Sequence, residues 1–283
     1  MVQTGTPLRL GVIVVPARKL NETALRFLIL AMNKEQELFQ FEFYNIVAGD
    51  PLLTVLKNDQ TVVRAEVWEQ LPNFVARARE HVESRTELMR LSEEPPNRFV
   101  IVSQCRFDDN FYSTRRSPAA VIALGNWKRH MAPPSFLEFV QALLVREAVA
   151  ALCPSLSGSG HLGNKGCLLD FTELLDEARQ KTLRGYVCHH CRSRMQADGL
   201  PELAGTVTHL LDREWLGQPS NPRSPAGVMA NLGYDLFTTK GRQETLKEAF
   251  LSVLRLEGAK QIVTVIGVVL VGLILYLLGL SGR

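Results

Sequence analysis

Apolar and polar positions divide the first half of the chain into alternating strands and helices. Continuous apolar runs and one alternating Phe-rich stretch predict four β-strands, at residues 8–16, 39–46, 98–104 and 119–125. Helical spacing of apolar positions predicts helices at residues 22–37 and 61–91. The polar stretch 105–118 is predicted to be a loop. Strands that alternate with helices in this way are typical of an α/β layer domain.

The most apolar helix of this first half is predicted at residues 135–153. Ser135 follows two prolines and precedes Glu138 by three positions, which is the spacing of a capping box. Apolar side chains occupy nearly every face of this helix. We therefore expect it to lie at the centre of the domain.

The second half of the chain has a different organisation. A glycine-rich stretch at 158–166 and a further helix precede the sequence CHHC, and another helix is predicted at 243–257. We expect three parts: a cytosolic α/β domain with a zinc-stabilised C-terminal subregion at residues 1–195, a helical connecting region at 196–260, and a C-terminal membrane anchor at 261–283.

Residues 262–280 form an apolar stretch without a single charged side chain. As a helix, these 19 residues would span roughly 28 Å, close to the ~30 Å hydrocarbon core of a bilayer. Lys247, Arg255 and Lys260 precede the stretch and only Arg283 follows it, so the positive-inside bias places the N-terminal part in the cytoplasm. We expect a single-pass, tail-anchored protein that contacts the lipid bilayer through this helix. The span has no GxxxG motif, which leaves formation of a homo-oligomer open.

Charge and composition narrow the classes of partner. The 283 residues include 32 basic and 29 acidic side chains, for a net charge of +3. This near balance lacks the strongly basic character of most nucleic-acid-binding proteins, so we expect a protein partner rather than a nucleic acid. The N-terminus lacks the pattern of a signal peptide, and we therefore expect the domain to occupy a reducing compartment.

In such a compartment, cysteines favour metal binding or burial over disulfide bonds. Cys188 and Cys191 form a CxxC pair late in the chain, whereas a thioredoxin-like motif follows a first strand. A structural zinc site needs four ligands, and Cys167 is the candidate for the third. Either His161 or Cys153 is expected to be the fourth.

The order of these features resembles that of the archaemetzincin-like zinc metallopeptidases. The resemblance covers residues 7–195 and rests on the central helix, the stretch HLGNKGCLLDF at residues 161–171 and the later CHHC. It implies an α/β fold with a metzincin-like mixed sheet and a central helix. It also implies a catalytic zinc bound by an HExxHxxGxxH motif, and a second, structural zinc bound by two cysteines that follow this motif and by a later CxxC pair.

The chain departs from that family at the catalytic ligands. In the helix end VREAVAALC, Glu147 stands in the place of the family's general base, but Arg146 and Ala150 replace the two helical histidines. Neither of these side chains can bind zinc. Leu162 stands where the first structural cysteine would follow, so the fourth structural ligand is left open. The resemblance implies a degenerate metallopeptidase fold, in which we expect Glu147 to be solvated or paired locally.

Two further sets of charged side chains suggest sites but have simpler explanations. Asp108, Asp109 and Asp170 could bind magnesium, although adjacent aspartates more often cap loops. The basic stretches 113–117 and 127–130 could hold an anionic ligand, although we expect them to be solvated loop charges.

Two hypotheses about function follow. The first is a non-catalytic, membrane-anchored interaction, effector or sensor protein, placed by analogy in a bacterial defence or stress system. The second is a membrane-tethered zinc-dependent hydrolase with atypical ligands, in which Glu147 is the base and His161 a ligand of the catalytic zinc. The missing helical histidines favour the first.

Overall fold

The structure is a computed structural model that describes residues 6–15, 21–45, 49–57, 60–92, 94–128, 131–157, 161–162, 166–234, 250 and 270. The chain divides into two compact units, residues 1–242 and 243–283. The predicted helix at 243–257 and the predicted span at 262–280 lie outside the described residues, apart from Phe250 and Leu270. Within the described ranges, no helix combines the length and apolar character needed to cross a bilayer.

A five-stranded sheet forms the centre of the first unit, with the strand order β2-β1-β4-β7-β6. Strands β2, β1, β4 and β7 pair in parallel, and β6 pairs antiparallel with β7 at one edge. The four predicted strands and the mixed sheet are confirmed. The bounds are β1 (Leu8–Val14), β2 (Phe39–Phe43), β4 (Arg98–Ser103), β6 (Ser113–Arg116) and β7 (Ala119–Ala123).

The predicted loop at 105–118 is partly wrong, because it contains β6 and the two-residue strand β5 (Arg106–Phe107). Strand β5 pairs in parallel with β3 (Thr61–Val62), so the helix predicted from residue 61 begins only at Arg64. Strands of two to four residues are too short to show a clear alternation of apolar and polar positions in the sequence. Strand β6 is also polar throughout, as an edge strand can be.

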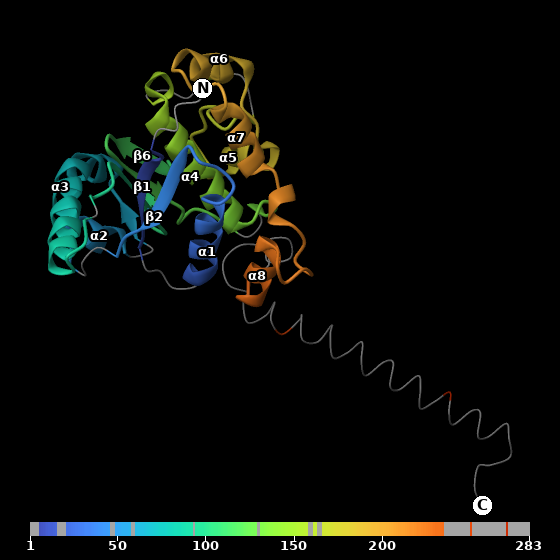
Figure 1. The fold of residues 1–283 in the computed structure, drawn as a ribbon, viewed down its shortest axis with the longest axis horizontal. Coiled ribbons are helices and arrows are strands. Elements are labelled where there is room, and N and C mark those ends of the chain that lie inside the picture. Colours follow the sequence, from blue (N-terminus) through green and yellow to red (C-terminus); the bar gives the residue numbers. More distant parts are fainter. Residues whose placement is uncertain are drawn as a thin grey trace, which may run out of the picture. The chain divides into compact units, whose positions relative to one another are not determined.

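The central strands are continuously apolar because both of their faces are covered. Val12 and Val100 belong to the core on one side of the sheet, whereas Ile13 and Ile101 belong to the core on the other. Helices lie on both sides of the sheet (Figure 1). A largely parallel sheet covered in this way does not need polar positions on its central strands.

The two faces carry different helices. The core on one face includes side chains of α2 (Pro51–Leu56) and α3 (Arg64–Leu88). The core on the other face includes side chains of α1 (Glu22–Met32), α4 (Phe136–Leu152), α5 (Leu175–Arg184), α6 (His189–Ala197), α7 (Leu203–Leu211) and α8 (Pro225–Asn231). Helices α7 and α8, which come from the predicted connecting region, therefore share the core of the α/β domain.

Helix α4 is central, as predicted. Ser135 is its N-cap and accepts a hydrogen bond from the Glu138 N–H, while the Glu138 carboxylate accepts one from the Ser135 N–H at 2.6 Å. This reciprocal pair is the predicted capping box. Helix α4 contacts strands β4 and β7 on one side and helices α1, α5 and α7 on others. It thus lies between the sheet and helices α5 and α7.

Candidate metal centre

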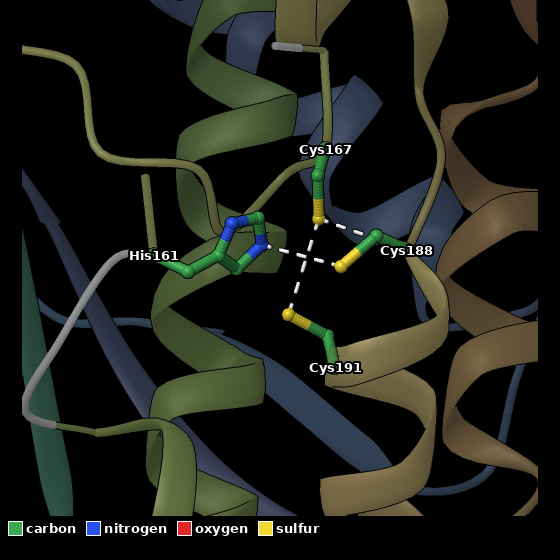
Figure 2. A group of neighbouring side chains, drawn as sticks. All are labelled: His161, Cys167, Cys188 and Cys191. Atoms are coloured by element: carbon green, nitrogen blue, oxygen red, sulfur yellow. Dashed lines mark hydrogen bonds between the residues drawn. The ribbon is translucent and has the colours of Figure 1, made fainter. Parts of the chain in front are cut away.

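Four of the predicted ligands lie together. His161, Cys167, Cys188 and Cys191 each offer one ligand atom, and these atoms all lie within 4.8 Å of one another. Figure 2 shows the imidazole and the three sulfur atoms pointing toward a common centre. The cysteines are buried and His161 is half-buried. Of the two candidates for the fourth position, His161 is the one that the structure brings into the cluster.

Short backbone contacts hold the Cys167 loop beside the Cys188 segment. Cys167 forms a β-bridge with Tyr186, and the Leu168 N–H donates to the Tyr186 carbonyl at 2.9 Å. The Cys188 N–H donates to Cys167 Sγ at 3.4 Å. Gly185, with a φ of 54°, ends α5 in the left-handed conformation that glycine adopts without steric cost. The chain therefore leaves α5 in a turn and reaches the cluster three residues later.

Cys188 and Cys191 come from the beginning of α6. Cys188 is the N-cap and Cys191 lies in the first turn, so their spacing of three places both side chains on one side of the helix. No side chain caps α6 at this end. The N–H groups of a helix N-terminus favour negative charge nearby, and the cluster lies at this end of α6.

His161 is held by its backbone and lies beside a buried carboxylate. Its carbonyl accepts a hydrogen bond from the Phe171 N–H at 2.8 Å. Its Nε2 lies 3.3 Å from Cys188 Sγ, whereas its Nδ1 lies 3.6 Å from Asp170 Oδ1. Both Nδ1 and this Oδ1 are buried and have no hydrogen-bond partner among the described residues. A carboxylate beside Nδ1 favours the tautomer in which Nε2 is free to bind a metal.

The distances between the donor atoms fit a tetrahedral zinc ion. In a tetrahedral site, zinc–sulfur bonds of about 2.3 Å place two sulfur ligands roughly 3.8 Å apart. A sulfur and a nitrogen ligand lie roughly 3.6 Å apart, because the zinc–nitrogen bond is shorter. Cys167 Sγ and Cys191 Sγ are separated by 4.0 Å, and Cys188 Sγ and His161 Nε2 by 3.3 Å. Three cysteines and one histidine are also a common structural zinc set. The cluster can therefore bind Zn²⁺ as a structural cofactor, as predicted.

Negative charge on the cluster is concentrated first on Cys167. Its pKa is lowered to about 4 because the Cys191 thiol and the backbone N–H groups of Cys188 and Leu169 donate to its sulfur, against the opposing effect of burial. The hydrogen bond to Cys167 and burial in turn raise the pKa of Cys191. Further deprotonation thus brings like charges together, and a bound dication removes that penalty.

Cys153, the alternative fourth ligand, is not in the cluster. It is the C-cap residue of α4, and burial together with the nearby Asp198 carboxylate raises its pKa to about 11. Its position therefore excludes it, because its sulfur is not among the donor atoms that lie together. Cys105 is buried in the core on the opposite face of the sheet, where burial raises its pKa.

Glu147 is buried, so the expectation of a solvated carboxylate is wrong, and its shorter ion pair is with a residue distant in the sequence. The Arg115 Nε and Nη2 groups donate to its two carboxylate oxygens at 2.6 and 2.7 Å. The Glu147 side chain is only 5% exposed. Its neighbour Arg146 lies farther away, with Nη1 at 4.0 Å. The sheet brings Arg115 under α4, a proximity that no local sequence pattern indicates.

The three aspartates considered as magnesium ligands do not come together. Asp108 accepts a hydrogen bond from the Arg64 N–H, and Asp109 pairs with the Arg64 side chain. Asp170 lies instead beside His161. This role of Asp170 was not predicted, and residue spacing gives no signal for it, because it depends on the β-bridge between residues 161 and 170.

No protein-family model matches the chain, and no curated protein matches it in sequence. Two solved structures are similar to it. The archaemetzincin of Methanopyrus kandleri is 15% identical, with a TM-score of 0.43 over 70% of this chain and 98% of that one. A zinc-dependent peptidase of Methanocorpusculum labreanum is 13% identical, with a TM-score of 0.40 over 66% of this chain and 99% of that one.

Replacement of one sulfur ligand tests the centre. In the full chain, Cys188→Ser is expected to abolish stoichiometric zinc binding and to lower Tm strongly. The reason is that structural zinc contributes about 10–16 kcal/mol in small domains, as much as the ~5–15 kcal/mol that stabilises a whole domain. Elemental analysis and thermal unfolding measure the two effects. Cys105→Ser and Cys153→Ser are matched controls and should keep one zinc. A Cys188→Ser chain with one zinc and an unchanged Tm would contradict the site.

Replacement of the carboxylate beside His161 tests how the imidazole is held. Asp170→Ala is expected to weaken zinc binding about 10–100-fold, and Asp170→Asn, which keeps an oxygen acceptor, should have an intermediate effect. Competition with a chromogenic chelator measures the affinity. Asp176→Ala removes an exposed aspartate of α5 and serves as the control. Equal zinc affinity in all four proteins would show that Asp170 does not position His161.

Proposed function

We propose that this chain is a non-catalytic protein in which a zinc-stabilised α/β domain is tethered to a membrane and acts through a protein partner. The observation that carries the proposal is the composition of the metal centre. Among the described residues it is the one cluster of metal-ligating side chains, and it offers four protein ligands. Four protein ligands close the coordination sphere of zinc, whereas a catalytic zinc keeps an open position for water.

The surroundings of Glu147 support the same conclusion. Its two oxygens are both engaged by Arg115 in a bidentate ion pair, an arrangement that suits a structural role for this carboxylate. Arg146 adds a second positive charge 4.0 Å away. Two guanidinium groups beside the carboxylate oppose the binding of a metal dication there.

The hydrolase alternative requires a different set of contacts for His161. It requires His161 to bind a catalytic zinc near Glu147. In the structure, Nε2 of His161 faces Cys188 Sγ in the four-residue centre, and Nδ1 faces the carboxylate of Asp170. The non-catalytic function is therefore preferred.

The membrane tether rests on the sequence of residues 262–280, which is uncharged and long enough to span a bilayer. Its flanking basic residues favour a cytoplasmic domain. A stable domain held at a membrane surface suits an effector or sensor that recruits or detects a protein partner, with a bacterial defence or stress system as the proposed setting. Self-association through the tether is compatible with this role.

The absence of hydrolysis is tested with the full chain and Glu147→Gln. The purified chain is expected to contain one zinc, and Glu147→Gln should leave any background hydrolysis of a peptide library unchanged, because Glu147 is held in an ion pair. Glu80→Gln, an exposed residue of α3, is the control. Two zinc ions per chain, together with hydrolysis lost in Glu147→Gln and kept in Glu80→Gln, would establish the hydrolase instead.

The tether is tested by cell fractionation. The full chain is expected to remain in the membrane pellet after alkaline carbonate washing, and a chain that ends at residue 261 should leave it. Leu270→Arg should weaken insertion, because an arginine at the centre of a span costs about 2.5–3.5 kcal/mol. Leu88→Arg, at an exposed leucine of α3, should have no effect. Pelleting of the shortened chain would contradict the tether.

A further inference from the structure

A small cavity lies between the sheet and α4, next to the Arg115–Glu147 ion pair. Its volume is about 10 Å³, which is room for about one water-sized group. Arg98, Arg115 and Glu147 supply its charged lining, together with apolar side chains and Ala120. Arg98 is only half-buried, so the cavity lies close to the surface.

The strand register explains why the cavity exists. Ala120 of β7 pairs with Val100 on one side and with Arg115 on the other. Arg98 lies two residues before Val100, so its side chain is on the same face of the sheet. The small side chain of Ala120 leaves space between the two long arginines, and Glu147 reaches this space from α4.

Positive charge exceeds negative charge at this place. Arg115 is satisfied by Glu147 and by the Ser157 carbonyl, to which Nη1 donates at 2.7 Å. Arg98, in contrast, has no hydrogen-bond acceptor or acidic partner for its guanidinium among the described residues. Burial and then the charge of Arg115 lower the pKa of Arg98, and the charge of Glu147 only partly offsets them. A partly desolvated cation without its own counter-ion is costly.

We propose that this cavity is an anion-binding site that takes one oxygen of a small oxyanion, either a carboxylate or a phosphate group, against the guanidinium of Arg98. Guanidinium groups bind both kinds of oxyanion through charge-assisted hydrogen bonds. The size of the cavity admits one oxygen, and the rest of the ligand stays outside. The solvated loop charges predicted for residues 113–117 thus include, in Arg115, one wall of a binding site.

Arg116, the next residue, provides a matched control. It lies on the opposite face of β6, with its guanidinium 4.1 Å from the centre of the Trp68 ring. It does not line the cavity. A general attraction of anions to basic residues would involve Arg116 as much as Arg98, whereas a built site involves Arg98 alone.

Calorimetric titration of the full chain in a neutral detergent with sodium phosphate, and separately with sodium acetate at the same ionic strength, tests the site. One saturable site is expected for at least one of the two anions, and the preferred anion identifies the chemical source of the oxygen. Arg98→Gln should weaken binding by about tenfold or more, as loss of a charge-assisted hydrogen bond does, whereas Arg116→Gln should change it less than about twofold. No saturable binding, or equal loss in both variants, would overturn the proposal.

Thermal unfolding separates binding from folding. Without added anion, Arg98→Gln should unfold at the same temperature as the unchanged chain or higher, because it removes an unpaired charge. The preferred anion should then raise the Tm of the unchanged chain and of Arg116→Gln, but not that of Arg98→Gln. An equal rise in all three proteins would show a general salt effect and would overturn the site. Zinc content should be the same throughout, which keeps this result separate from the metal centre.

Discussion

The C-terminal half of the domain depends on one constraint: three thiol groups and an imidazole are held within 4.8 Å of one another. Once the thiols lose their protons, the like charges repel, and only a cation at their centre makes the arrangement favourable. The ligands come from a loop after α4 and from the start of α6. A metal at this point therefore fixes both ends of the segment that contains α5, and holds that helix against α4.

Much of this arrangement could be predicted from the sequence because it depends on patterns of neighbouring residues. The apolar runs indicate β1, β4 and β7, and the Ser135–Glu138 spacing marks the beginning of α4. The CxxC spacing likewise places two sulfur atoms on one side of a helix. Each of these signals lies within a few residues, where the geometry of a single element decides the outcome.

The remaining features depend on residues that are distant in the sequence. Arg115 and Glu147 are 32 positions apart and meet only because β6 joins the edge of the sheet under α4. Strand β6 itself is polar and four residues long, so its sequence looks like a loop. His161 and Asp170 meet through one β-bridge. Whether His161 or Cys153 joins the cluster also depends on the path of the chain after α4, which local sequence patterns do not predict.

The Arg115–Glu147 pair also has a consequence for how this chain can change by mutation. Loss of either partner alone leaves a charge without its counter-ion in a mostly buried place, at a cost of about 3 kcal/mol. That is a large fraction of the ~5–15 kcal/mol that stabilises a typical domain. Single substitutions at either position are therefore disfavoured, and the two residues are expected to be exchanged together.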